Sequence, residues 1–223
     1  MNTAFPVSLR KAKRRGNLFQ MILGESFFNR DAQIVAKALL GKVLRVKYRR
    51  MWLSAQIIET EAYYLHEKGS HASLGFTEKR KALFMKPGTI YMYYARGGDS
   101  LNVSCQGGGN AVLIKSGIPY GDSEKMIQTM QMLNPCNGRL RAPEKLCSGQ
   151  TLLCKSLHLK MPDWDQQQFD AEKFYIEDVG YQTKQIIQTT RLGIPEGRDE
   201  HLEFRFVDKT FLKYCTKMPV VVQ

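Results

Sequence analysis

The sequence has 223 residues, enough for one domain with a substantial hydrophobic core. Hydrophobic residues make up 43% and aromatic residues 10%, a composition that excludes a largely disordered chain. Lysine and arginine exceed aspartate and glutamate by 33 − 21 = 12, which favours a polyanionic partner such as nucleic acid or an acidic membrane surface. No window approaches the ~20 apolar residues of a membrane-spanning helix, so no membrane insertion is expected.

The cysteines and the basic N-terminal residues indicate the compartment. Five cysteines, none in a Cys-x-x-Cys spacing, fit a disulfide framework poorly, so reduced thiols are expected. Five of the six residues 10–15 are basic, and no apolar stretch follows them as in a secretory signal. We expect a basic tail over residues 1–17, one folded domain over 18–223, and an intracellular protein.

The first half of the chain predicts a helix followed by strands. Residues 31–41 carry apolar side chains at helical spacing between a capping Asp31 and a terminating Gly41. Residues 42–63 alternate apolar and polar on both sides of Arg49–Arg50, which is typical of an antiparallel hairpin. Strands are also expected over 88–95 and 100–105, around a Gly97–Asp99 turn, and over 110–117.

Helical spacing returns at residues 122–133 and 142–157, the second with an interruption at Gly149. Residues 189–195 and 202–209 are expected to be strands or near-strands. Strands, then helices, then strands predict a single compact α+β domain with a mostly antiparallel, curved sheet and several helices.

Glu59 and Glu61 stand two residues apart near the end of a predicted strand, so both side chains point to one face. Two carboxylates on one face repel unless a cation or hydrogen bond neutralises one, and such an environment can leave the other as a general base. The alternative is a pair on the solvent face of an edge strand.

Tyrosines and histidines follow, and they suit a pocket that stacks a flat, electron-poor ring, although tyrosines in strands are often plain packing residues. His66 and His71 have neither helical nor strand-face spacing for a metal site, so no metal and no cofactor are expected. The glycines 107–109 lack the lysine of a phosphate-binding loop, and no Gly-x-Ser-x-Gly nucleophile motif occurs.

The segments ETEAY, FMKPGTIYMY, LNVSCQG, AVLIK and LCSG occur in an order and at distances that resemble the alkyladenine (3-methyladenine) DNA glycosylase family. GESFFNRDAQIVAKALLGKVL is similar to the family's opening helix and first strand, so the resemblance covers roughly residues 19–207. It implies a metal-independent, monomeric DNA repair enzyme that removes alkylated purines, chiefly 3-methyladenine, from double-stranded DNA.

The resemblance also implies roles for individual residues. Glu61 would be the general base that activates water, and Glu59 a supporting group. Tyr63 and Tyr93 would sandwich the extruded base, while His71 and Tyr91 would belong to the pocket. Asn102 would obstruct the amino group of guanine.

Two departures from the family pattern affect the site. The hairpin around Arg96 is one residue shorter than usual, so Arg96 and Tyr94 are both candidates for the wedge that fills the gap in the duplex. Lys115 stands where an arginine is common, which keeps the charge beside the catalytic group but not the fork geometry.

Three other functions compete with this interpretation. A catalytically weak double-stranded DNA damage-binding module would keep the basic surface without needing Glu61. A nucleosidase acting on free nucleosides would not need the net charge of +12. A helix-hairpin-helix glycosylase is disfavoured by the strand content. For the glycosylase, the expected location is the cytoplasm, at the nucleoid in a bacterium, or the nucleus in a eukaryote.

Overall fold

The computed structural model describes residues 21–95 and 97–217 of the chain. The tail predicted over residues 1–17 and the wedge candidate Arg96 lie outside the described residues. Strands of the described part are β1 Met21–Ile22, β2 Val43–Tyr48, β3 Met51–Tyr63, β4 Ile90–Ala95, β5 Gly98–Ser104, β6 Ala111–Pro119, β7 Phe174–Asp178, β8 Ile186–Thr189 and β9 Arg205–Asp208.

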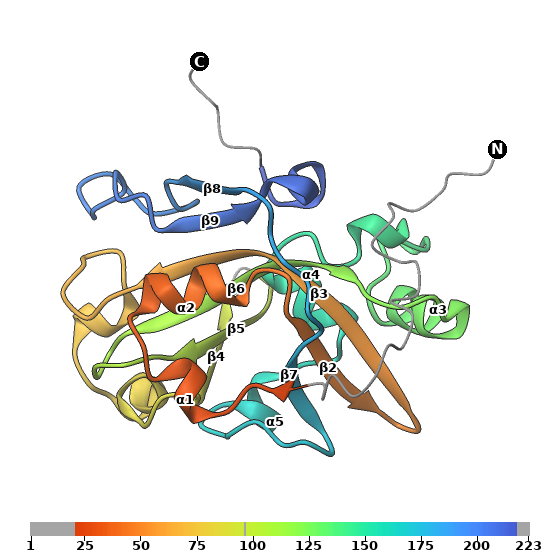
Figure 1. Cartoon of the computed structure of the whole chain (residues 1–223), viewed down its shortest axis with the longest axis horizontal. Coiled ribbons are helices and arrows are strands. Elements are labelled where there is room, and N and C mark those ends of the chain that lie inside the picture. Colours follow the sequence, from red (N-terminus) through yellow and green to blue (C-terminus); the bar gives the residue numbers. More distant parts are fainter. Residues whose placement is uncertain (1–20, 96, 218–223) are drawn as a thin grey trace.

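The helices lie around the sheet (Figure 1). The α-helices are α1 Glu25–Phe28, α2 Ala32–Leu39, α3 Glu124–Leu133, α4 Gln150–Ser156 and α5 Met161–Trp164. The 3-10 helices are His71–Leu74, Glu78–Phe84, Pro143–Lys145 and Lys209–Tyr214.

The long strand β3 is the centre of one antiparallel sheet with the order β1-β7-β2-β3-β6-β5-β4. β2 pairs with the first half of β3, β6 pairs along most of it, and β9 pairs with Glu59–Glu61 near its end. β8 pairs with β9, and these two strands lie above β3 in Figure 1, joined to it through β9. The α+β prediction is confirmed, and β3 is an internal strand rather than an edge strand.

Local sequence explains the elements that lead to the site. The predicted hairpin is confirmed: β2 and β3 are joined through Arg49 and Arg50, and Arg49 adopts φ 55° at the turn. The predicted helix is confirmed as α2, which begins after Asp31, because that carboxylate accepts hydrogen bonds from the backbone N–H groups of Gln33 and Ile34.

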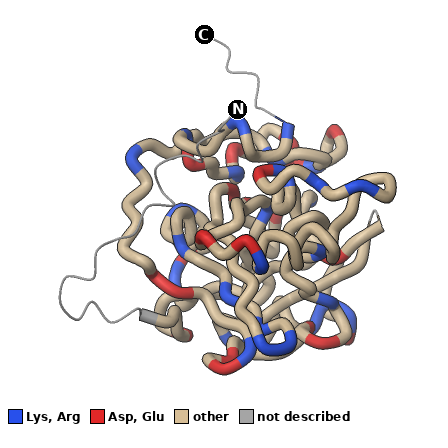
Figure 2. The backbone as a smooth tube through the Cα atoms, turned by 90° about the vertical axis from the view of Figure 1, so that its right-hand side faces the viewer, with Lys and Arg blue, Asp and Glu red and all other residues tan. Residues whose placement is uncertain are grey.

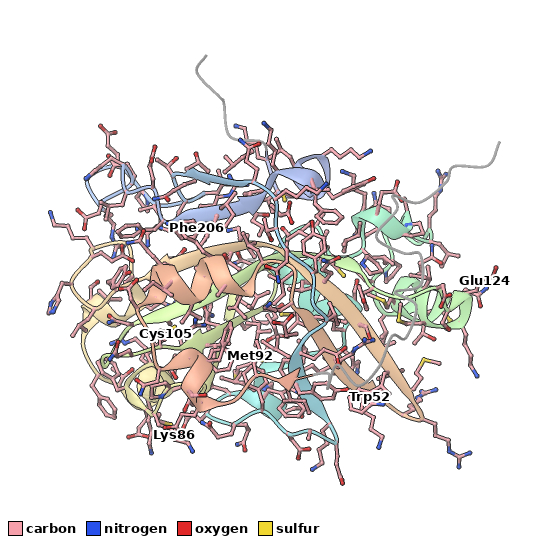
Figure 3. The ribbon with its side chains drawn as sticks, viewed as in Figure 1. Trp52, Lys86, Met92, Cys105, Glu124 and Phe206 are labelled. Atoms are coloured by element: carbon pink, nitrogen blue, oxygen red, sulfur yellow. The ribbon has the colours of Figure 1, made fainter. Side chains whose placement is uncertain are left out.

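The core lies on both faces of β3. The larger cluster joins residues of α2, α3 and α4 to the sheet, and it includes Phe206 of β9 and Met92 of β4, both labelled in Figure 3. A smaller cluster around Ile58, Val207 and Phe211 packs the 3-10 helix Lys209–Tyr214 onto the opposite face. Burial on both faces explains why residues Leu53–Ala62 are all buried.

The interruption predicted at Gly149 is confirmed. Residues 142–157 form a 3-10 helix and α4, and Gly149 precedes α4 with φ 111° and donates its N–H to the Ser116 hydroxyl. The structure corrects two other predictions. Of the predicted strand 189–195, only Thr189 is in a strand, because β8 ends at this residue. The β4–β5 turn is tighter than predicted, because Gly98 and Asp99 already belong to β5.

Basic and acidic residues are mixed on the side of the molecule that faces the viewer in Figure 2, with Lys and Arg on several separate segments. Within residues 21–95 and 97–217, no helix has the length and apolar character needed to cross a membrane. The described cysteines are free thiols, four of them buried, with Cys136 exposed.

Candidate active site

Glu61 is a fully buried carboxylate in the centre of the sheet, paired with Leu113 of β6. Its Oε2 accepts a hydrogen bond of 2.8 Å from the Tyr63 phenol. Its Oε1 lies 3.3 Å from Nζ of Lys115 and accepts no hydrogen bond from the described residues. One oxygen of Glu61 is therefore committed to the protein, and the other has acceptor capacity left beside a cation.

Lys115 reaches Glu61 because β6 is irregular at this point. Glu59 pairs with Ser116 and Thr60 pairs with Ile114, so Lys115 falls at a register shift between two paired residues. Such bulges re-aim a side chain relative to a regular ladder, and they are common beside active sites. The Lys115 side chain is 11% exposed, so its ammonium group offsets the Glu61 charge in surroundings with little water.

A cavity of about 340 Å³ opens next to this pair. Tyr63 and Lys115 contribute to its lining, as do the aromatic residues His71, Tyr91 and Tyr93. Residues 192–195, between β8 and β9, form a further part of the wall. Glu61 itself is not in the lining, because it lies behind Tyr63 and Lys115.

The aromatic wall is held by ring contacts and one hydrogen bond. The rings of His71 and Tyr93 lie edge to face with centroids 4.5 Å apart, and Tyr91 and Tyr93 are 5.6 Å apart. Nδ1 of His71 and the Tyr91 hydroxyl are 3.0 Å apart. The sequence placed Tyr63, His71, Tyr91, Tyr93 and Lys115 in one site, and the structure brings these five together.

The pKa values of two aromatic residues are shifted in directions that suit this arrangement. Burial, with the neighbouring Glu61 carboxylate, raises the pKa of Tyr63 well above its usual value of 10.0. The Tyr63 phenol therefore stays protonated and remains a hydrogen-bond donor to Glu61 at neutral pH. Burial, with Arg80 and Arg198 nearby, lowers the pKa of His71 below 6.5, so its imidazole is uncharged at neutral pH.

The lowered pKa of His71 predicts an acid-sensitive stability. Because the folded state binds this proton less tightly than the unfolded state, stability should fall as pH drops through about 6.5 toward the lower folded pKa. We expect His71→Gln to reduce the loss of melting temperature between pH 7.5 and pH 5. Thermal melts of both proteins across this range test this, and parallel curves would contradict it.

Glu59 has a different environment, although it is also fully buried. Its Oε1 accepts hydrogen bonds of 2.7 Å from Nε of Arg205 and from the Thr216 hydroxyl. Its Oε2 accepts from the Ser116 hydroxyl and from the Thr216 backbone N–H. The alternative of a solvent-facing pair on an edge strand is thus wrong, and Glu59 ties β3 to β9, β6 and the residues after β9.

Asn102 and Tyr94 lie beside the cavity but are not in its lining. Asn102 is 6% exposed, and its Nδ2 donates a hydrogen bond of 3.2 Å to the Tyr91 carbonyl oxygen. Tyr94 is 66% exposed near the end of β4, in the hairpin that contains Arg96. The exposed aromatic ring is available for contact with a large partner.

Several residues of the site were not predicted from the sequence. Arg191 and Glu67 form a buried ion pair behind Tyr63, and Gln150 of α4 contributes to the cavity lining. The only local signal for Arg191 was its place inside the predicted strand 189–195. Gln150 donates to the Ser100 hydroxyl, and its Oε1 is buried without a hydrogen-bond partner among the described residues.

An α+β domain with a buried carboxylate, a lysine and an aromatic cavity defines an enzyme-like site for a flat ligand. Residues 26–211 match the family model described as methylpurine-DNA glycosylase (MPG). The chain belongs to this family. A relative from Pseudomonas savastanoi pv. phaseolicola is 59% identical over 202 residues, which cover 89% of this chain and 91% of the relative.

Two further relatives are similar to this chain. A protein of Pseudomonas aeruginosa strain LESB58 is 60% identical over 202 residues, which cover 89% of this chain and 84% of the relative. One from Koribacter versatilis is 32% identical over 205 residues, covering 89% and 96% respectively. All three relatives are named "Putative 3-methyladenine DNA glycosylase". The resemblance found in the sequence is therefore confirmed at the level of the family.

Proposed function

We propose that this protein excises alkylated purines, 3-methyladenine among them, from duplex DNA by hydrolysing the N-glycosidic bond. The observation that carries this proposal is the buried Oε1 of Glu61. It has no hydrogen bond from the described residues, lies 3.3 Å from the Lys115 ammonium and lies behind an aromatic cavity. A carboxylate oxygen with free acceptor capacity is the group required to take a proton from water.

The reaction follows from this geometry. A duplex hides its glycosidic bonds, so the damaged nucleotide must rotate out of the stack before it enters the cavity. The water oxygen then bonds to the sugar C1′, and its proton passes to Glu61. The electron pair of the broken C1′–N bond leaves with the purine, which alkylation has made a good leaving group. Lys115 balances the charge on Glu61, and Tyr63 fixes the orientation of the carboxylate.

The remaining site residues have supporting roles in this proposal. Tyr63 and Tyr93 stack on the flipped base, at roughly 0.5–2 kcal/mol for each contact with a cationic ring. His71 and Tyr91 hold the wall, and Asn102 excludes guanine. Tyr94 or Arg96 fills the gap left in the duplex. We expect a monomer that acts in the bacterial cytoplasm, on the chromosome.

Release of bases from defined substrates tests the proposal. The wild-type chain would be incubated with methylated duplex DNA, the same DNA as single strands, and methylated nucleosides, and the released bases separated by chromatography. We expect release of 3-methyladenine from the duplex, at a rate that falls steeply as salt increases. Salt-insensitive cleavage of free nucleosides would indicate a nucleosidase. Tight binding without release would indicate a damage-binding module.

The proposed gate at Asn102 makes a separate prediction. In Asn102→Ser the shorter side chain should leave room for an exocyclic amino group, so we expect release of 7-methylguanine relative to 3-methyladenine to increase several-fold. The ratio of the two bases released from one methylated duplex measures this directly. Because Asn102 also donates to the Tyr91 carbonyl, Asn102→Asp serves as a comparison of similar size. An unchanged ratio in Asn102→Ser would count against the gate.

A further inference from the structure

Arg191 lies against the rear face of the Tyr63 ring. Its guanidinium carbon is 4.5 Å from the Tyr63 ring centroid and 5.4 Å from that of Phe204. The residue is 4% exposed, so this cation is held away from water. Tyr63 also lines the cavity, so its ring separates the cavity from a buried positive charge.

Glu67 supplies the counter-charge. Its Oε1 lies 2.5 Å from Nη1 of Arg191, which also donates to the Ala62 carbonyl oxygen at 3.0 Å. The same Oε1 accepts from the backbone N–H of Tyr64. Nε and Nη2 of Arg191 have no hydrogen-bond partner among the described residues. The ion pair therefore lies at the end of β3, and only part of the hydrogen-bonding capacity of the guanidinium is used. The position of the guanidinium thus depends on Glu67 and on the two aromatic rings.

The same pair connects two walls of the cavity. Residues 69–71 follow Glu67, residues 192–195 follow Arg191, and both segments contribute to the lining. A second set of contacts joins them again, because Arg198, which also contributes to the lining, donates to the Lys68 carbonyl oxygen and Asp199 accepts from the Lys68 backbone N–H. These contacts would hold the two segments together even when the charge of the Arg191–Glu67 pair is altered.

The charge behind Tyr63 affects what can stack in front of it. An aromatic ring attracts a cation to either face, but two cations on opposite faces repel each other through the ring. Around this cavity Lys115 and Arg191 offset Glu61 and Glu67, so these four groups supply no net negative charge. A cationic base thus gains less from Tyr63 than it would from a tyrosine without Arg191.

We propose that Arg191, held by Glu67, is a positioning residue that sets the preference of the pocket between cationic and neutral modified purines. The guanidinium lowers the advantage of a cationic ring on Tyr63, so that neutral rings of the same shape compete for the site. This inference rests on the proposed function, because it assumes that a flipped purine stacks on Tyr63.

Opposite charge changes in one ion pair provide the test. Arg191→Met removes the positive charge, and Glu67→Gln leaves it without compensation. Each would be made in a Glu61→Gln background, so that bound DNA is not consumed. Dissociation constants would be measured for three duplexes of one sequence, containing 3-methyladenine (cationic), hypoxanthine (neutral) or no lesion. The preference is the ratio of the constants for the two lesions.

We expect Arg191→Met to shift the preference toward the cationic lesion by about three- to tenfold, and Glu67→Gln to shift it toward the neutral one by a similar factor. Arg191→Lys, which keeps the charge, should stay within about twofold of the parent. A purely structural role would move both variants in the same direction or not at all, and either result would overturn the inference.

Controls separate folding and function from this effect. Arg45→Met breaks the Arg45–Glu177 pair on β2 and β7, outside the cavity lining, and should lower the melting temperature without changing the preference. If Arg191→Met fails to fold, Glu67→Gln still tests the sign, since it retains the guanidinium. If neither lesion duplex binds more tightly than the undamaged duplex, the proposed function is contradicted together with this inference. If the lesion duplexes bind more tightly but the preference is the same in all variants, only this inference is contradicted.

Discussion

Glu61→Gln should abolish base release while leaving DNA binding within a few-fold of wild type. The amide keeps the size of the carboxylate and can still face Tyr63 and Lys115, but it cannot accept a proton from water. Because a general base contributes about 10²–10⁴ to a rate, we expect single-turnover base release to fall by about a thousandfold. Rates at saturating enzyme on methylated duplex DNA measure the chemical step alone.

A matched control distinguishes this effect from a general loss of negative charge. Glu124→Gln makes the same substitution on α3, at the right-hand edge of the molecule in Figure 3 and outside the cavity lining, and should leave the rate unchanged. Tyr63→Phe removes one hydrogen bond to Glu61 but no proton acceptor, so its effect on the rate should be smaller. A Glu61→Gln protein with a wild-type rate would contradict the assignment of Glu61 as the general base.

Arg205→Met should destabilise the fold strongly, more than the substitutions proposed at the cavity. Arg205 and Glu59 are both fully buried, with Nε and Oε1 2.7 Å apart, and removing the guanidinium leaves an uncompensated carboxylate in the core. Breaking a buried pair in this way costs about 3–5 kcal/mol of unfolding free energy. For a domain of this size, that corresponds to a fall in melting temperature of roughly 10 °C.

The double variant Glu59→Gln/Arg205→Met tests the physical reason. It removes both charges, and the glutamine amide oxygen can still accept from the Ser116 hydroxyl and the Thr216 backbone N–H, while its NH2 can donate to the Thr216 hydroxyl. We expect it to recover at least half of the stability lost in Arg205→Met. Chemical denaturation of the two variants and of wild type measures the difference. A double variant less stable than Arg205→Met would show that the charge imbalance is not the cause.

Much of the sheet could be predicted because its signals are local. The alternation around Arg49–Arg50 specifies the β2–β3 hairpin, and the capping carboxylate of Asp31 specifies the start of α2. The prediction of a strand over 189–195 was wrong. This segment has few apolar residues, and Gly193 and Pro195 prevent a continuous ladder of hydrogen bonds. Those residues instead turn over the cavity, where Arg191 is buried.

The site could be predicted only where its residues belong to a family motif. Glu61 and Tyr63 lie in one such segment, and Tyr91, Tyr93 and Lys115 in others. The partners of Glu59 and Tyr63 could not be predicted, because Arg205 and Arg191 are more than one hundred residues away in the chain. Long-range pairs of this kind depend on how β9 and the preceding segment fold back onto β3.

Lys115 offers the main chemical alternative to water as the nucleophile, because a lysine amine can attack a sugar C1′ and form an imine. Incubation of the wild-type protein with methylated duplex DNA and borohydride, followed by gel analysis and base chromatography, decides between them. Hydrolysis with Glu61 as the base predicts release of 3-methyladenine, an abasic strand and no protein–DNA adduct. A trapped covalent adduct at Lys115 would contradict the mechanism proposed for this site.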